Sequence, residues 1–366
     1  MKSSSACSVF SVVKFLIAPD KFIGSLAARA IAEAIAAGIR DSLPHAEITL
    51  LPIADGGEGT AEVICAASAG EWHECDVHDP LGRPVVARYC TIENGATAVM
   101  EMSEASGLWR LAEDERDPLI TSSFGTGEML LDAAQRRAKE IIIGLGGSAT
   151  NDGGVGMARA LGFRFVDSDG VDLPPFTTEL LRLARIEAPA ELRLPTITAA
   201  VDVRNPLLGE RGATRVFGPQ KGAKPEHLEL LERALTRVAD VVAGEHRDAP
   251  GAGAAGGLGF ALLAFCGAEL RSGFEVVAER VGLPAAIRDA DVIITGEGRL
   301  DAQTSEGKAP AGVAKLARAA GKKVHAVVGA TTGEADALFD HVVAVGCSDD
   351  PANGLRARAR ALARTL

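Results

Sequence analysis

The chain has few aromatic residues, no closely spaced cysteine pair and no long apolar run. Aromatic residues make up 4% of the 366 residues, while alanine and glycine are abundant, and small side chains suit close helix–sheet packing. The six cysteines include no C-x-x-C pair, which argues against a disulfide framework and favours a reducing, cytoplasmic location. No stretch approaches the ~20 apolar residues that a membrane span needs.

An excess of positive charge is also missing. The formal net charge is −11, which argues against nucleic acid as the principal partner but not against ATP, because local loops decide that binding. Hydrophobic residues at 47% and a mean hydropathy of +0.14 describe an ordinary globular protein, long enough for two domains. Residues 1–13 are too polar for a secretory signal and are expected to form a disordered extension.

The secondary-structure pattern predicts an α/β fold. Strand and helix patterns alternate at the amino end and return after residue 290, with hairpin-like sequence from 71 to 105 between them. The simplest architecture is a parallel-sheet domain built from both chain ends, with a second, mixed α/β domain inserted. We place the first domain at 14–72 and 288–366, and the inserted one at 73–287.

The most informative stretch is GLGGSATNDGG, residues 144–154. It follows the strand-like segment 140–143 and precedes a helical one, 155–161. Glycines at such a junction let the backbone approach a ligand, and the N–H groups at a helix start favour an anion. The polar side chains here could orient a phosphate, a hydroxyl or hydrated Mg²⁺; they are Ser148, Thr150, Asn151 and Asp152.

Further glycine-rich loops follow other predicted strands. Loops 55–60 and 295–301 each place acidic residues among glycines after an apolar segment, and 251–259 is a third glycine-rich run. Open α/β sheets bind ligands at the carboxyl ends of their strands. Several such loops together indicate a polyanionic ligand accompanied by a metal.

Two common nucleotide-binding motifs are missing. No G-x-x-x-x-G-K-[ST] is present, because Gly307-Lys308 is followed by Ala309 and residue 302 is alanine. The expected G-x-G-x-x-G of a nicotinamide dehydrogenase does not follow the first strand. The chain is therefore not predicted to be a P-loop kinase, and the dehydrogenase is the weaker enzyme alternative.

The motifs resemble those of the bacterial two-domain glycerate kinase family. The matches run in order from about residue 14 to 345, at 18–26, 54–60, 144–154, 202–207, 217–223, 251–259, 295–304 and 307–310. The family commonly has a lysine where this chain has Ile23, and Lys21 is a candidate substitute. Loop 144–149 also resembles the phosphate loop of mevalonate and homoserine kinases, whose other motifs are missing.

The resemblance implies a flavodoxin-like outer domain, ATP and Mg²⁺ as cosubstrate and cofactor, and D-glycerate as acceptor. For this type the usual product is 2-phosphoglycerate rather than 3-phosphoglycerate. The expected partners are these small molecules, with a homodimer as a further possibility, and neither nucleic acid nor membrane. A non-catalytic metabolite sensor on the same fold, or a kinase for another small hydroxy acid, stays open as an alternative.

Roles follow from the chemistry that phosphoryl transfer needs. We expect the Gly146–Gly147 backbone with Ser148, Thr150 and Asn151 to cradle phosphate, and Arg299 to hold the glycerate carboxylate. Lys221 and Lys308 would neutralise phosphate charge, Asp55 and Asp301 would hold Mg²⁺, and Asp202 would position or deprotonate the hydroxyl. The remaining expected binding residues are Asp20, Lys21, Asp152, Asn205 and Glu297.

Overall fold

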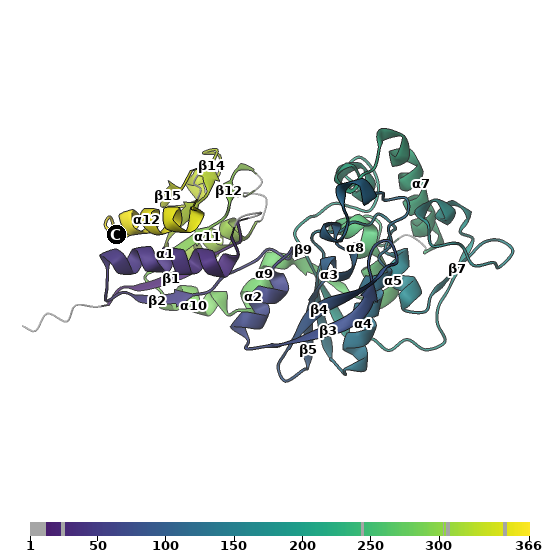
Figure 1. Ribbon diagram of the computed structural model, residues 1–366, viewed down its shortest axis with the longest axis horizontal. Coiled ribbons are helices and arrows are strands. Elements are labelled where there is room, and N and C mark those ends of the chain that lie inside the picture. The colour runs from purple at the N-terminus through teal and green to yellow at the C-terminus, as the bar shows by residue number, and fades with distance from the viewer. Residues whose placement is uncertain (1–11, 23–25, 243–244, 303, 305–307, 347–349) are drawn as a thin grey trace, which may run out of the picture. The chain divides into compact units, whose positions relative to one another are not determined.

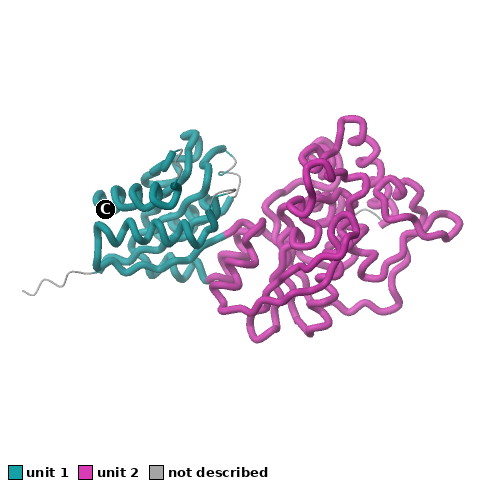
Figure 2. Tube along the Cα trace, in the orientation of Figure 1, with its two compact units in different colours: residues 1–53, 282–366 teal, residues 54–281 magenta. Residues whose placement is uncertain are grey.

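The computed structural model describes residues 12–22, 26–242, 245–302, 304, 308–346 and 350–366. Ile23 and residues 1–11 of the expected extension lie outside these ranges. The chain divides into two compact units, coloured separately in Figure 2: residues 1–53 with 282–366, and residues 54–281. The fold is α/β, as expected.

The first unit is built on a five-stranded parallel sheet. Its strands are β1 (Lys14–Pro19), β2 (Glu47–Leu50), β11 (Val292–Gly296), β13 (Lys323–Val328) and β15 (His341–Ala344). Their order across the sheet is β15-β13-β11-β1-β2, and every neighbouring pair is parallel. Numbered along the chain this is the 2-1-3-4-5 order of flavodoxin-like folds, with the switch between β1 and β11.

Helices complete the first unit. They are α1 (Ala28–Ser42), α10 (Leu283–Asp289), α11 (Ala309–Ala319) and α12 (Pro351–Ala363), with a short β12–β14 pair (Arg299–Leu300, Ala330–Thr331) and the turn η6 (Asp336–Leu338). Ile31, Ile35 and Ile39 recur every four residues on α1 and are fully buried. Gly38 lets α1 approach α12 closely, since a methyl group there would lie 2.2 Å from the Arg356 carbonyl oxygen; the two helices lie side by side (Figure 1).

The second unit contains a six-stranded mixed sheet. Its strands are β3 (Glu71–His78), β4 (Pro84–Ile92), β5 (Thr97–Glu101), β6 (Glu140–Gly144), β9 (Thr196–Val201) and β10 (Glu269–Ser272). The order is β10-β9-β6-β5-β4-β3; the first four are parallel, and β5, β4 and β3 are joined antiparallel. The hairpin-like sequence expected from 71 to 105 includes the Asn94-Gly95 turn between β4 and β5, with positive φ at both residues.

Short strands β7 (Arg164–Val166) and β8 (Arg185–Glu187) form a separate ribbon in this unit. Its helices are α2 (Thr60–Ala67), α3 (Ser103–Ser106), α4 (Phe124–Gln135), α5 (Val155–Ala160), α6 (Ala213–Phe217), α7 (Pro225–Val241), α8 (Ala254–Cys266) and α9 (Gly273–Arg280). Its 3-10 turns are η1 (Leu108–Arg110), η2 (Glu113–Glu115), η3 (Thr177–Arg182) and η4 (Pro219–Lys221).

The unit boundaries differ from those expected. Helix α2, assigned above to the parallel-sheet domain, packs against β4, β5 and α9 of the second unit, and α10 packs against β1 and α11 of the first. Alternation of strand and helix does not distinguish which sheet a helix covers. Within the described ranges, no helix is both long and apolar enough to cross a membrane.

Candidate active site

The glycine-rich loop joins buried strand β6 to α5 and is shaped by close backbone contacts. A methyl group at Gly146 would lie 2.6 Å from the Gly57 Cα, so the loop lies directly against the Asp55–Thr60 loop of the same unit. Gly256 packs still closer: its φ is +67°, and a methyl group there would lie 1.9 Å from the Thr150 carbonyl oxygen. Two glycine-rich runs thus position Ser148 and Thr150 through backbone contact.

The other edge of this loop pairs with the chain between α3 and η1. Leu108 N–H donates to the Gly147 carbonyl at 2.8 Å, and Ala149 N–H donates to the Ser106 carbonyl at 2.9 Å. Gly107 and Ser148 form an antiparallel bridge. The loop is therefore held on both sides before any ligand binds.

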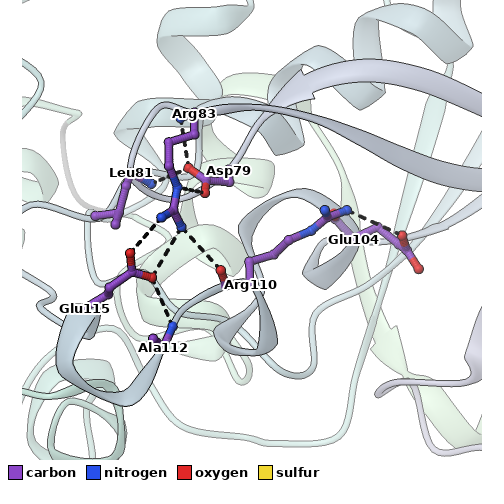
Figure 3. Close-up of polar contacts among 7 residues, drawn as sticks. All are labelled: Asp79, Leu81, Arg83, Glu104, Arg110, Ala112 and Glu115. Atoms are coloured by element: carbon purple, nitrogen blue, oxygen red, sulfur yellow. Dashed lines mark hydrogen bonds and ion pairs between the residues drawn. The ribbon is translucent and has the colours of Figure 1, made fainter.

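Arg83 and Arg110 fix the segment that makes this pairing (Figure 3). Arg83 donates to the buried Asp79 carboxylate and, at 2.7 Å, to Glu115. The same guanidinium reaches the Arg110 carbonyl at 3.3 Å, and Arg110 donates through Nε to the Glu104 carbonyl at 2.9 Å. These contacts hold the segment whose Ser106 and Leu108 pair with the glycine-rich loop.

Lys221 is the buried cation of the loop. It ends η4, where Pro219 starts the turn and Gly222, with φ +96°, terminates it against the Arg116 carbonyl. Its Nζ donates to Ser148 Oγ and to the Thr150 carbonyl oxygen, each at 2.7 Å. The residue is 2% exposed.

Burial lowers the pKa of the Lys221 ammonium to about 7, because desolvation penalises its charged form. The negative charge of Asp152 acts in the opposite direction but does not compensate. An amine poised in this way exchanges a proton near neutral pH, which an exposed lysine does not do.

Asn151 and Thr150 each carry a buried polar atom with no partner in the part of the chain that the structure describes. Asn151 is fully buried and donates through Nδ2 to Thr214 Oγ1 at 3.0 Å. Among the described residues, its Oδ1 and the Thr150 Oγ1 have no hydrogen-bond partner. Such groups are costly to leave unsatisfied, so a polar ligand that reaches them is favoured.

The Asp152 carboxylate lies at the start of α5. Its carboxylate accepts hydrogen bonds from the N–H of Ser123, Gly154 and Gly156 and from Ser123 Oγ, at 2.8 to 3.1 Å. Ser123 Oγ in turn accepts from Met157 N–H at 3.0 Å. The carboxylate thus satisfies the amino end of α5 and ties it to α4, which is a structural arrangement.

The neighbouring loop carries Asp55. Its Oδ1 accepts from Gly57 N–H at 3.2 Å, and the residue is half-buried. Glu101, at the end of β5, accepts from Gly59 and Ala61 N–H at 2.9 Å and so caps the start of α2. Asp55 therefore stands on a loop anchored by a buried carboxylate.

Two expected residues follow β9. Asp202 comes directly after the strand and is exposed. Asn205 donates to the Arg211 carbonyl at 2.7 Å, and its own carbonyl accepts from Gly253 N–H at 2.9 Å. Asn205 thus fastens the 251–259 run to the loop after β9.

In the first unit, a second polar cluster follows β11. Glu297 is 7% exposed, and its carboxylate accepts a hydrogen bond from Thr304 Oγ1 at 2.6 Å. Thr304 Oγ1 in turn accepts a hydrogen bond from Asp301 N–H at 3.1 Å. Lys308 Nζ lies 3.8 Å from Glu297 and 3.9 Å from Asp301. Arg299, largely exposed, lies 3.8 Å from Asp301. The structure brings together these four expected residues with Thr304.

Asp20 and Lys21 lie at the same sheet edge. Asp20 N–H donates to the Gly296 carbonyl at 2.8 Å, and the Asp20 carboxylate accepts from Lys21 N–H at 2.7 Å. Both follow β1, whose Pro19 pairs with Gly296. They therefore lie beside the loop that begins with Glu297.

The donor chemistry of the cluster suits Mg²⁺. Carboxylate and hydroxyl oxygens are hard ligands, and the Lys308 ion pairs at 3.8 and 3.9 Å are longer than hydrogen bonds. Among the described residues, no group of three or more His, Cys, Asp and Glu side chains could hold a metal alone. Mg²⁺ commonly takes one or two carboxylates and completes its shell with substrate phosphates and water.

Sequence reasoning missed Thr214, Ser123 and Thr304 as site residues. Thr304 lies inside a matched motif, so a hydroxyl three residues after Asp301 was a usable signal. Thr214 and Ser123 lie in segments with no such signal, and only the tertiary structure brings them to Asn151 and Asp152.

Comparisons with known proteins agree along most of the chain. The model of the glycerate kinase family matches residues 15–361. The chain is 44% identical to a glycerate kinase of Bacillus subtilis (strain 168), covering 90% of this chain and 88% of that protein. It is 42% identical to glycerate 2-kinase of Escherichia coli (strain K12), covering 93% and 94%. A crystal structure described as that of a "putative glycerate kinase 2" from Salmonella typhimurium LT2 superposes with a TM-score of 0.87 at 44% identity, and the match covers 97% of this chain and 98% of that one.

Proposed function

This chain belongs to the glycerate kinase family, and we propose that it transfers the γ-phosphoryl group of ATP to D-glycerate to give 2-phosphoglycerate. The similarity to a relative named glycerate 2-kinase supports attack by the 2-hydroxyl. The cytoplasm is the proposed location, from the scattered cysteines.

The observation that carries the proposal is the buried Lys221 with its two hydroxyl-bearing neighbours, Ser148 and Thr150. The Lys221 amine, the Ser148 hydroxyl and the Thr150 hydroxyl lie at one glycine-rich loop, and the Thr150 hydroxyl has no hydrogen-bond partner among the described residues. Such preorganised donors stabilise a phosphoryl group during transfer, when its charge is spread over its equatorial oxygens. We therefore place the reacting phosphoryl group at this loop.

The Glu297 cluster is proposed to bind the metal–nucleotide complex. Glu297 and Asp301 supply carboxylates, Thr304 orders both, and Lys308 supplies positive charge for the phosphates. Asp55, in the second unit, is proposed separately as a residue that can bind Mg²⁺. When bound, Mg²⁺ would neutralise part of the negative charge of the phosphates.

The acceptor is proposed to be oriented by exposed groups. Arg299 presents a guanidinium that can hold the glycerate carboxylate through two parallel hydrogen bonds. Asp202 is proposed to position the hydroxyl. If so, Asp202→Asn lowers turnover by about 10² or more while ATP affinity stays unchanged; unchanged turnover would remove Asp202 from the mechanism.

The direct test is ADP release from Mg-ATP in the presence of D-glycerate, L-glycerate or no acceptor. Enolase, which acts on 2-phosphoglycerate and not on 3-phosphoglycerate, is added alone to report the product. ADP release that depends on D-glycerate, together with an enolase signal, supports the proposal. ADP release without that signal overturns the 2-phosphoglycerate product, and ATP binding without acceptor-dependent release supports the sensor alternative.

A further inference from the structure

The contacts of Lys221 identify a hydrogen-bonded pair, Ser148 and Lys221, that is shielded from solvent. The two residues are 8% and 2% exposed, and Ser148 Oγ is 2.7 Å from Lys221 Nζ. A charged ammonium donates to Ser148. A neutral amine at the same separation can accept the Ser148 proton while still donating to the Thr150 carbonyl, also 2.7 Å away. The geometry serves both protonation states.

Among the described residues, the charged group whose field acts on the Lys221 ammonium is Asp152. The Asp152 carboxylate already accepts four hydrogen bonds at the start of α5. Arg116 approaches the adjacent Gly222 through its carbonyl oxygen. Desolvation therefore dominates and lowers the pKa of Lys221 to about 7.

We propose that Ser148 and Lys221 together accept the proton of the attacking glycerate hydroxyl, with Ser148 as the relay and Lys221 as the base. This inference rests on the proposed glycerate kinase function and adds a proton acceptor to it. Adjacent serine–lysine pairs work as base and hydroxyl in other enzyme classes, so the chemistry is available to this pair.

The step balances as follows. The glycerate hydroxyl oxygen forms a bond to the γ-phosphorus, and the bond from that phosphorus to the β,γ-bridging oxygen breaks, so ADP leaves with the electron pair. The hydroxyl proton passes to Ser148 Oγ, and the Ser148 proton passes to Lys221 Nζ. The ammonium so formed lies beside the transferred phosphoryl group, and its proton returns to solvent when product leaves.

The structure favours this pair over Asp202 as the proton acceptor. Asp202 is exposed, whereas Lys221 is buried and its hydrogen bond to Ser148 fixes the direction of transfer. Ser148 is also held by the Gly107 bridge, so the relay oxygen has a defined position. Asp202 then orients the substrate without receiving its proton.

The test is the pH dependence of kcat, measured from about pH 5 to 9 on the full chain with Mg-ATP and D-glycerate. Wild-type kcat should rise with pH and level off above about 7, because the amine must be neutral to accept a proton. Lys221→Arg keeps the positive charge but does not deprotonate. It should lower kcat by about 10²–10⁴ and remove the inflection near 7.

Ser148→Ala should lower kcat by a similar factor, and Ser148→Thr, which keeps the hydroxyl, should restore part of it. Lys224→Arg, an exposed lysine three residues along, is the matched control and should leave the profile unchanged. Mg-ATP affinity by calorimetry should stay within about threefold in each variant, which separates proton transfer from nucleotide binding.

Two results overturn the inference while leaving the kinase intact: a Lys221→Arg enzyme with near wild-type kcat and profile, or a Ser148→Ala enzyme with both unchanged. If Lys221→Arg does not fold, as thermal unfolding will show, the Ser148 variants decide alone. A wild-type protein that binds Mg-ATP but phosphorylates no glycerate overturns the proposed function instead.

Discussion

Lys221 in the second unit is 2% exposed and donates two hydrogen bonds of 2.7 Å, whereas the Lys308 side chain in the first unit is 34% exposed and lies 3.8 Å from Glu297. Both lysines lie within motifs that match the same family, yet Lys221 is desolvated and held by two hydrogen bonds, whereas Lys308 is partly exposed and makes long ion pairs. Burial lowers the pKa of Lys221. Partly exposed ion pairs such as those of Lys308 contribute little to stability.

The difference indicates separate tasks. A tightly packed cradle suits a reacting centre, where small displacements reduce the rate strongly. A loosely paired acidic cluster suits a metal–nucleotide complex, whose ligands exchange with each turnover. The predictions below test whether the two clusters differ in this way.

The largest expected effect comes from the backbone contact beneath the cradle. Gly256→Ala would place a methyl group 1.9 Å from the Thr150 carbonyl at a φ of +67°. It should reduce the free energy of unfolding by about 3 kcal/mol or more, measured by chemical denaturation. Gly267→Ala is the control: it has φ +62° and no atom within 4 Å, so about 1 kcal/mol is expected. Equal losses would show that the close contact is not decisive.

A smaller effect is expected from the support of Asn151. Thr214→Val removes the acceptor of the Asn151 amide, which is fully buried. The unsatisfied N–H should reduce the free energy of unfolding by about 1–3 kcal/mol, and turnover should fall with it. Thr214→Ser keeps the hydroxyl and should recover most of both. A Thr214→Val protein with unchanged turnover would remove Asn151 positioning from the account.

The pH dependence of stability tests the buried amine itself. The pKa of Lys221 is lowered to about 7 in the folded chain, and an unfolded lysine titrates near 10.4, so the unfolded state binds the extra proton between these values. Stability from this site therefore rises with pH across that window and is lowest below about 7. The unfolding free energy of wild type relative to Lys221→Met should increase by about 1.4 kcal/mol per pH unit. A flat difference would mean that the pKa is not lowered.

The smallest effect on stability is expected in the acidic cluster. Among the described residues, Lys308→Ala removes ion pairs of 3.8 and 3.9 Å, so the free energy of unfolding should change by about 0.5 kcal/mol or less. The KM for Mg-ATP should nevertheless rise by about tenfold, because a phosphate counter-charge is lost. A stability loss as large as that of Thr214→Val would erase the contrast between the clusters.

Much of the fold could be predicted from the sequence, because hydrophobic periodicity and turn residues act locally. Strand β6 covers the expected 140–143, and α5 begins at the expected residue 155 and ends within one residue of the expected 161. The assignment of α2 to the second unit could not be predicted, since nothing in an amphipathic helix identifies the sheet it covers.

The candidate site was predictable only in part. Motifs identified the glycine-rich loop and Lys221, but not that Nζ lies within hydrogen-bonding distance of Ser148. Asp152 shows what the sequence does not contain. A carboxylate beside glycines predicts a ligand-binding residue, and only the fold shows that its oxygens accept hydrogen bonds from Ser123 and from the start of α5. The hydrogen-bond partners of such a carboxylate depend on which backbone N–H groups the fold brings close to it.

The most direct test of the division between the clusters is a calorimetric titration of Mg-ATP into Lys221→Met and Glu297→Gln, with Glu334→Gln as an exposed control in the first unit. The account predicts that Glu297→Gln weakens Mg-ATP binding by about tenfold or more, while Lys221→Met binds within about threefold of wild type despite lost turnover. Loss of Mg-ATP binding in Lys221→Met, with wild-type affinity in Glu297→Gln, would contradict it.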